Sequence, residues 1–209
     1  MTSLPFLDNF LTDTTGNYSK SGTWTWNSGQ YVAHASTSQD FMVQDVGQSD
    51  LLEVVGSIVV TSAPISTNDY LGVQLAANNL TAGSNRGYII CFRGLGTTPD
   101  YNNIWLLDSN IAWVTSGAFT WTTGIKYWLK IRRIGTTIYC RIWQDGNAEP
   151  STWTITATVT ARTDTQIGFA SSTPGDTVVG NFSNLSGISL IPPTKPININ
   201  QAVHRASRW

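Results

Sequence analysis

Short strand-like segments alternate with turn clusters along almost the whole chain, and this pattern limits the fold more than any other feature. No window of useful length has the 3.6-residue periodicity of an amphipathic helix. The segments instead combine β-branched and aromatic residues with alternating polarity, which is typical of strands. The predicted strands are residues 4–13, 22–27, 31–36, 51–62, 70–76, 86–93, 103–107, 112–115, 126–134, 137–144, 153–161, 166–172 and 178–190.

Turn-forming residues separate these segments. Gly, Asn, Asp, Ser and Pro gather at residues 15–17, 66–69, 83–85, 98–100 and 145–147, where their backbone preferences favour turns. So many short strands at this spacing predict an all-β fold, a two-sheet antiparallel sandwich or jelly roll. The 209 residues suit one such domain, because sandwiches of about 200–250 residues form single units. We assign the domain to residues 1–191.

Charge is scarce, and its shortage excludes several classes of protein. Only 12% of the residues are charged, and 12 Lys and Arg face 13 Asp and Glu, whereas an average soluble protein has about 25% charged residues. A nucleic-acid binder needs a basic stripe, so no nucleic-acid partner is expected. No apolar run reaches the ~18–20 residues of a membrane span, so no membrane partner is expected either.

The N-terminus reads MTSLPFLDNF, without a basic region followed by an apolar stretch. It therefore predicts no secretory signal peptide. Under this interpretation the protein stays in the cell that makes it or leaves by another route.

The two cysteines, Cys91 and Cys140, both lie in predicted strands. Free cysteine behaves as a small hydrophobic residue, so we interpret both as buried thiols. A single disulfide between neighbouring strands is the alternative, since sequence does not fix the distance between their Cα atoms.

Residues 126–144, KYWLKIRRIGTTIYCRIWQ, predict a β-hairpin whose faces can be sorted by alternation. A two-residue turn at 134–135 or at 135–136 gives the same sorting. The predicted core face carries Tyr127, Leu129, Ile131, Ile138, Cys140 and Ile142. The opposite face carries Trp128, Lys130, Arg132, Tyr139, Arg141 and Trp143.

This basic and aromatic face is the candidate ligand or interface site, and three interpretations stay open. It could be a solvated sheet surface covered by long Lys and Arg stems. It could bind a glycan, with rings stacking on sugars and Arg donating to hydroxyls or carboxylates. It could also be a protein interface, where Trp, Tyr and Arg are favoured anchors.

The last residues, 192–209, differ from the rest in being proline-rich and purely basic in their charge. A frayed terminus is one interpretation. A segment of this kind seldom orders by itself, so we expect an extended arm that docks on a partner subunit. The docking residues would be Pro192, Pro193, Lys195, Pro196, Arg205, Arg208 and Trp209.

Catalytic and metal-binding groups are sparse. Glycosidases need two carboxylates ~5–5.5 Å apart for the retaining mechanism, but the only glutamates, Glu53 and Glu149, are far apart in sequence. We expect Glu53 to lack a partner in its apolar strand and Glu149 to occupy a turn. Two single histidines and two single cysteines do not predict a zinc site. We therefore expect no catalytic residues, no metal and no cofactor, with a calcium site at Asp8 or Asp176 as a lesser alternative.

One set of motifs along the chain matches the pattern of a known fold family. It comprises Trp128, Gly135-Thr136-Thr137, Trp143-Gln144-Asp145-Gly146, Glu149-Pro150, Trp153 and Gly168-Phe169, with Leu7-Asp8-Asn9-Phe10 before it and Asn181-Phe182 after it. This pattern resembles the concanavalin A-like (laminin G-like) jelly-roll domains common in bacteriophage virion proteins and bacterial surface proteins. The resemblance covers roughly residues 4–191 and implies that fold, which hosts many functions.

Two functions follow as hypotheses. The first is a non-enzymatic structural protein of a bacteriophage virion, a capsid decoration or tail appendage made in the host cytoplasm. Its arm would dock on other virion proteins, and the protein would form a homo-oligomer. The alternative is a lectin-like carbohydrate-binding module for host-surface glycans, with Trp128, Tyr139, Arg141 and Trp143 as its platform. A hydrolase ranks third.

Overall fold

The computed structural model describes residues 4–34, 39–77, 87–108, 112–172 and 179–191. The predicted docking arm, residues 192–209, lies outside this range, and so does Asp176. The elements are β1 (Phe6–Asp8), η1 (Thr15–Asn17), β2 (Ser19–Ser21), β3 (Thr23–Trp26), β4 (Tyr31–His34), β5 (Gln39–Asp45), β6 (Leu52–Ser62), β7 (Tyr70–Ala77), β8 (Tyr88–Arg93), β9 (Asn103–Asp108), β10 (Ala112–Ala118), β11 (Lys126–Ile134), β12 (Thr137–Gln144), β13 (Ile155–Thr158), β14 (Gln166–Ser172) and β15 (Val179–Ser189).

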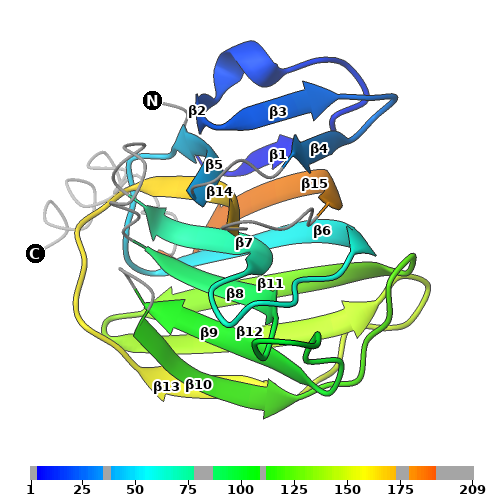
Figure 1. Ribbon diagram of the computed structural model, residues 1–209. Helices are drawn as coiled ribbons and strands as arrows, with labels where there is room; N and C mark the ends of the chain where they lie inside the picture. Colours follow the sequence, from blue (N-terminus) through cyan, green and yellow to red (C-terminus); the bar gives the residue numbers. More distant parts are fainter. Residues whose placement is uncertain (1–3, 35–38, 78–86, 109–111, 173–178, 192–209) are drawn as a thin grey trace, which may run out of the picture.

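The strands form two antiparallel sheets that pack face to face (Figure 1). Sheet A has the order β13-β12-β11-β6-β15-β4-β3, with β1 paired to β15. Sheet B has the order β10-β9-β8-β7-β14-β5-β2. In the part of the chain that the structure describes, no helix is long and apolar enough to cross a membrane. The predicted two-sheet sandwich is confirmed.

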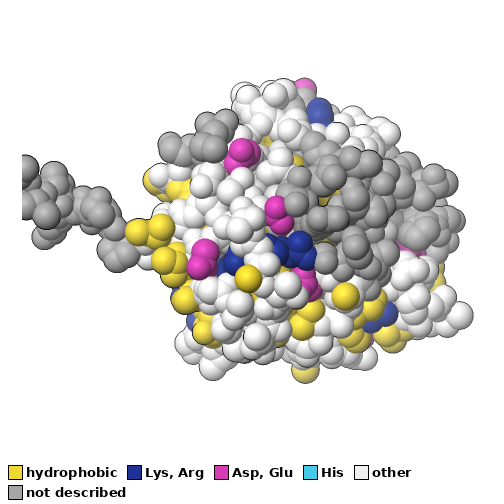
Figure 2. Space-filling model, turned by 90° about the vertical axis from the view of Figure 1, so that its left-hand side faces the viewer, with side chains coloured by type: hydrophobic (Ala, Val, Ile, Leu, Met, Phe, Trp, Pro, Cys, Tyr) yellow, Lys and Arg dark blue, Asp and Glu magenta, His cyan; other side chains and the backbone are white. Residues whose placement is uncertain are grey.

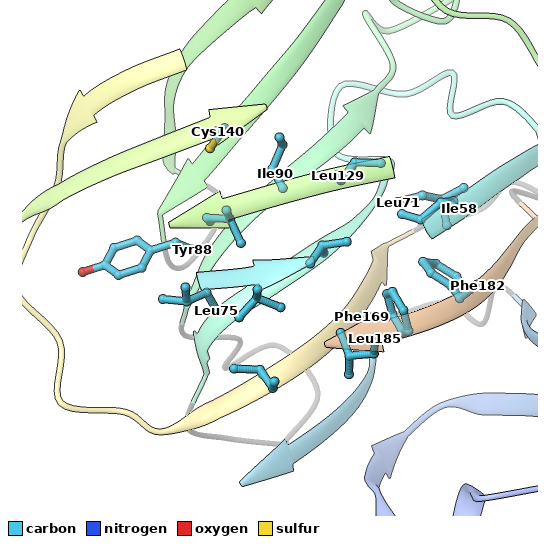
Figure 3. Close-up of a cluster of buried hydrophobic side chains, with 14 of the residues drawn as sticks. Ile58, Leu71, Leu75, Tyr88, Ile90, Leu129, Cys140, Phe169, Phe182 and Leu185 are labelled. Atoms are coloured by element: carbon cyan, nitrogen blue, oxygen red, sulfur yellow. The ribbon is translucent and has the colours of Figure 1, made fainter. Parts of the chain in front are cut away.

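The main core fills the space between the sheets. Phe169 of β14 and Phe182 of β15 belong to opposite sheets, and their ring centres lie 4.7 Å apart (Figure 3). Gly56 of β6 makes room for this packing, because a Cβ atom there would lie 2.7 Å from Phe169 Cε1 and 2.8 Å from Val73 Cγ2. The sheets therefore approach closely where β6 crosses β14 and β7.

Sheet B is also apolar on its outward side. A second cluster of buried side chains lies there, formed by Phe41, Val43, Tyr70, Ala77, Ile89, Cys91, Leu107 and Ala170. Cys91 belongs to this outward cluster, whereas Cys140 belongs to the core between the sheets. Both cysteines are buried free thiols, as the first interpretation of the sequence predicted.

Near the N-terminus the predicted strand 4–13 is a strand only at Phe6–Asp8. The Asp8 carboxylate ends it by accepting hydrogen bonds from the Phe10 backbone N–H at 2.9 Å, from Thr14 at 2.7 Å and from the Tyr18 hydroxyl at 3.0 Å. Asp8 is thus a structural acceptor. Within the described residues there is no group of three or more His, Cys, Asp or Glu side chains that could hold a metal ion.

Charges on the surface are mixed in sign. On the face drawn in Figure 2, acidic and basic side chains lie close together among neutral atoms. Arg162 forms ion pairs with Asp108 at 2.8 Å and with Asp164 at 3.7 Å.

Candidate functional site

The β11–β12 hairpin has the predicted bounds and the predicted faces. Its turn is Gly135-Thr136, since Ile134 pairs with Thr137, and Gly135 takes a φ of +61° that suits glycine. Burial alternates along both strands. All six residues of the predicted outer face lie on one side, in the cross-strand pairs Trp128–Trp143, Lys130–Arg141 and Arg132–Tyr139.

Two tryptophans stack at the open end of this hairpin. The rings of Trp128 and Trp143 are nearly parallel, at 13°, with their centres 6.3 Å apart. The Trp128 indole N–H donates to Asp145 Oδ1 at 2.5 Å, and the Lys126 ammonium lies 4.9 Å from the Trp128 ring centre. These contacts hold the Trp128 ring, and Trp143 stacks against it.

An ion-pair network crosses the middle of the face. Lys130 Nζ lies 3.1 Å from Glu53 Oε1 and 2.8 Å from Glu149 Oε2. Arg132 binds the other oxygen of Glu53, with Nη2 at 2.5 Å. The prediction that Glu53 lacks a partner is therefore wrong: the residue is buried because two cations on the neighbouring strand β11 compensate its charge.

Arg141 joins the network from β12. Its Nη1 lies 2.7 Å from Glu149 Oε1, and its Nη2 donates to the Ser151 carbonyl at 2.7 Å. The guanidinium also covers the Trp153 ring at 3.8 Å, and Trp153 packs against Tyr139 at 5.5 Å. Three cations and two carboxylates thus share one network, so the basic face expected from the sequence is largely neutralised.

The network also sets the charge state of Glu149. Burial on its own raises the pKa of this carboxyl, but hydrogen bonds from Lys130 and Arg141 outweigh it, and the pKa lies below its ordinary value. A general acid needs a raised pKa instead. Lys130 brings Glu53 and Glu149 together in space, and both form an ion pair with it.

The loop between β12 and β13, residues 145–154, is tied to the hairpin at several points. The Asp145 N–H donates to the Lys126 carbonyl at 2.8 Å, and the Thr154 N–H donates to the Cys140 carbonyl at 2.8 Å. Between these ends, Glu149 and Ser151 are held by Lys130 and Arg141. The loop backbone is therefore preorganised.

A pocket of about 400 Å³ lies between this loop, the end of β12 and the segment that follows β10. Trp143 belongs both to it and to the outer face of the hairpin. Its lining is Phe119, Thr120, Tyr127, Ile142, Trp143, Gln144, Asn147, Ala148, Pro150, Thr152 and Thr154. Aromatic rings thus stand beside amide and hydroxyl groups, and no charged side chain lines the pocket.

This lining suits a neutral polyhydroxylated ligand. Aromatic rings pack against the C–H faces of a sugar ring, while amide and hydroxyl groups both donate and accept hydrogen bonds. A volume of about 400 Å³ lies within the ~300–1,000 Å³ range of small-molecule sites.

Sequence reasoning found Trp143 but missed the polar part of the pocket. Gln144, Asn147 and Thr152 directly follow the hairpin, and Thr120 joins them from the β10–β11 connection. The run of amide, hydroxyl and proline residues after Trp143 was visible in the sequence, but only the folded loop places it beside the ring.

No protein-family model matches the sequence, and no curated protein matches it significantly. Solved structures do match the fold. Basic winged bean lectin with Tn-antigen is 12% identical and has a TM-score of 0.65, covering 88% of this chain and 97% of the lectin. The carbohydrate-binding module CBM66 from Bacillus subtilis is 13% identical with a TM-score of 0.60, covering 90% of this chain and 99% of the module.

A glycoside hydrolase is also similar. The GH43 protein BlXynB from Bacillus licheniformis is 12% identical with a TM-score of 0.64, and the match covers 88% of this chain but only 39% of the hydrolase. None of these three similar structures is a bacteriophage protein, so the virion role stays a prediction. At such low identities the likeness concerns the fold alone. The chain has a concanavalin A-like jelly-roll fold.

Proposed function

We propose that this protein is a carbohydrate-binding module that holds a neutral glycan without cleaving it. The observation that carries the proposal is the preorganised pocket beside Trp143, where aromatic rings and uncharged polar groups meet. Sugar recognition needs this pairing of an apolar surface with a few fixed donors and acceptors.

Two further facts support the proposal. Both glutamates are ion-paired with Lys or Arg, which suits a structural role better than proton transfer. Similar folds include a lectin with bound Tn-antigen and a carbohydrate-binding module. The virion alternative has no such support among the described residues.

The proposal predicts that Trp143→Ala weakens glycan binding by about tenfold or more, because it removes the ring that flanks the pocket. A neutral glycan array identifies a ligand, and isothermal titration calorimetry then measures its affinity for both proteins. Ile134→Ala is a matched control, since Ile134 is an exposed apolar residue at the opposite end of the same hairpin.

Glycan binding that is unchanged in Trp143→Ala would show that the glycan site is not the pocket beside Trp143. A folded wild-type protein that binds no glycan on a broad array would overturn the proposed function.

We also retain, as a separate proposal, that the protein is located on a bacteriophage virion, where it would dock on other virion proteins and on further copies of itself. It rests on the sequence resemblance and is compatible with glycan binding, because a particle surface can carry such a module. Mass spectrometry of purified particles tests the location, and a protein absent from them would contradict it.

A further inference from the structure

Arg93 lies between two tryptophans on the outward side of sheet B. It ends β8, while Trp105 belongs to β9 and Trp113 to β10. The Arg93 guanidinium carbon lies 4.4 Å from the Trp105 ring centre and 3.8 Å from the Trp113 ring centre. Both tryptophan rings therefore lie against the guanidinium group.

Further contacts hold the Trp105 and Trp113 rings in place. The Trp105 indole N–H donates to Asp100 Oδ2 at 2.8 Å. Trp113 meets Trp105 edge-on, with ring centres 5.8 Å apart, and meets Tyr70 edge-on at 6.3 Å. Such contacts fix the orientation of both rings, and with them the plane of the guanidinium.

Among the described residues, the outer nitrogens of Arg93 have no hydrogen-bond acceptor. Its Nε donates to the Thr67 carbonyl at 3.1 Å, and neither Nη group has a hydrogen-bond partner within the described chain. The Asp100 carboxylate acts on Arg93 electrostatically, but its oxygens accept hydrogen bonds from Asn102, Asn103 and Trp105. Burial lowers the pKa of Arg93, yet a guanidinium stays charged in proteins.

Other arginines in the described chain have acceptors for their outer nitrogens. Arg133 donates through Nη1 to the Ser49 carbonyl at 2.7 Å. Arg132, Arg141 and Arg162 each form an ion pair with a carboxylate. Arg93 forms no ion pair within the described residues, although two tryptophan rings and the Thr67 carbonyl hold its side chain. A fixed, partly buried cation with two free donor groups is suited to an anionic ligand.

We propose that Arg93, Trp105 and Trp113 form a second binding site, which takes the carboxylate of an acidic sugar residue. The two free Nη groups match the two oxygens of a carboxylate, and such bidentate pairs are strong and directional. The neighbouring indoles offer apolar surface to the sugar ring that carries the carboxylate. The sugar assignment rests on the proposed glycan-binding function, but the site is separate from the neutral pocket beside Trp143.

The test titrates the full-length protein with an oligogalacturonate and with a neutral galacto-oligosaccharide of the same length. Tryptophan fluorescence reports binding, because Trp105 and Trp113 adjoin the guanidinium. We expect the acidic oligosaccharide to bind through Arg93, with an affinity that falls about 10- to 100-fold in Arg93→Gln, the loss typical of a charged bidentate contact. Arg93→Lys keeps the positive charge but lacks the two parallel N–H donors of a guanidinium, so it should retain only part of the affinity.

Two variants serve as controls. Lys20→Gln removes one positive charge at an exposed position of β2 and should leave binding unchanged. Trp143→Ala should weaken binding of the neutral oligosaccharide rather than of the acidic one, because it removes a ring of the other pocket. If Arg93→Gln does not fold, which near-ultraviolet circular dichroism reveals, Arg93→Lys alone decides the outcome.

The other outcomes overturn the proposal in distinguishable ways. If the oligogalacturonate still binds to Arg93→Gln but no longer binds to Trp143→Ala, the acidic sugar lies in the pocket beside Trp143. The proposed function would then stand. Inorganic sulfate that binds at Arg93 as tightly as the oligogalacturonate would overturn the sugar assignment. Binding of the neutral oligosaccharide alone would remove the second site, whereas no binding of either would count against both proposals.

Discussion

Glu149 is the residue that connects the sheet to the pocket. It joins Lys130 and Arg141, and these residues also hold Glu53 and the Ser151 carbonyl. Sequence could not predict this arrangement, because Glu53 and Arg132 are 79 positions apart and meet only when β6 pairs with β11. Sequence placed Glu149 in a turn, but the turn lies at residues 145–146 and Glu149 follows it in the loop. Its two cationic partners were not predictable.

Glu149→Gln should lower the free energy of unfolding at neutral pH by about 1 kcal/mol, the upper range for partly exposed ion pairs. The pKa of Glu149 is lower in the folded than in the unfolded protein, so its contribution is complete above the unfolded pKa of about 4.3. It is lost as the pH falls through the folded pKa. Urea titrations between pH 7 and pH 3 check this, and parallel pH profiles for wild type and variant would contradict it.

Among the elements, the β11–β12 hairpin was predicted to the residue, while β2 and β5 were missed. The hairpin alternates cleanly because one face is core and the other is solvent-facing. In β5 Met42 faces the main core while Phe41 and Val43 face the outward cluster, so its apolar residues are consecutive and alternation disappears. When a strand is apolar on both faces, its sequence does not show which side chains point into the main core.

Gly56→Ala should destabilise the sandwich by about 1–3 kcal/mol, the usual cost of overpacking a core. The added methyl group would press on Phe169 and Val73 from the facing sheet. Thermal unfolding measures the effect. Gly16→Ala is the control, because a Cβ at that position meets nothing within 4 Å; equal melting temperatures for the two variants would show that the sheets can separate freely at Gly56.

For the whole molecule, the sandwich was predictable and the pocket was not. Turn spacing and strand composition define a two-sheet fold, but the pocket depends on how the 145–154 loop returns over the end of β12. That path follows from contacts between residues distant in sequence, such as Lys130 and Glu149. The fold class therefore emerges from local pattern, whereas the candidate site emerges from tertiary geometry.

The two cysteines offer a test of global packing. Burial raises the pKa of both Cys91 and Cys140. Cys91 is enclosed in the outward cluster of sheet B, and Cys140 is enclosed in the core between the two sheets. Neither thiol should react with iodoacetamide in the native protein, and both should react after unfolding in denaturant. Mass spectrometry counts the labels, and rapid labelling of Cys140 under native conditions would contradict the packing between the sheets.

The tethered 145–154 loop has a consequence for how quickly a ligand is captured. Its conformational freedom is already removed when the chain folds, so binding in the pocket requires no ordering of the backbone. Association is then governed by the frequency of correctly oriented collisions rather than by a slow rearrangement. Affinity differences between related glycans should accordingly reside in how long each one stays bound.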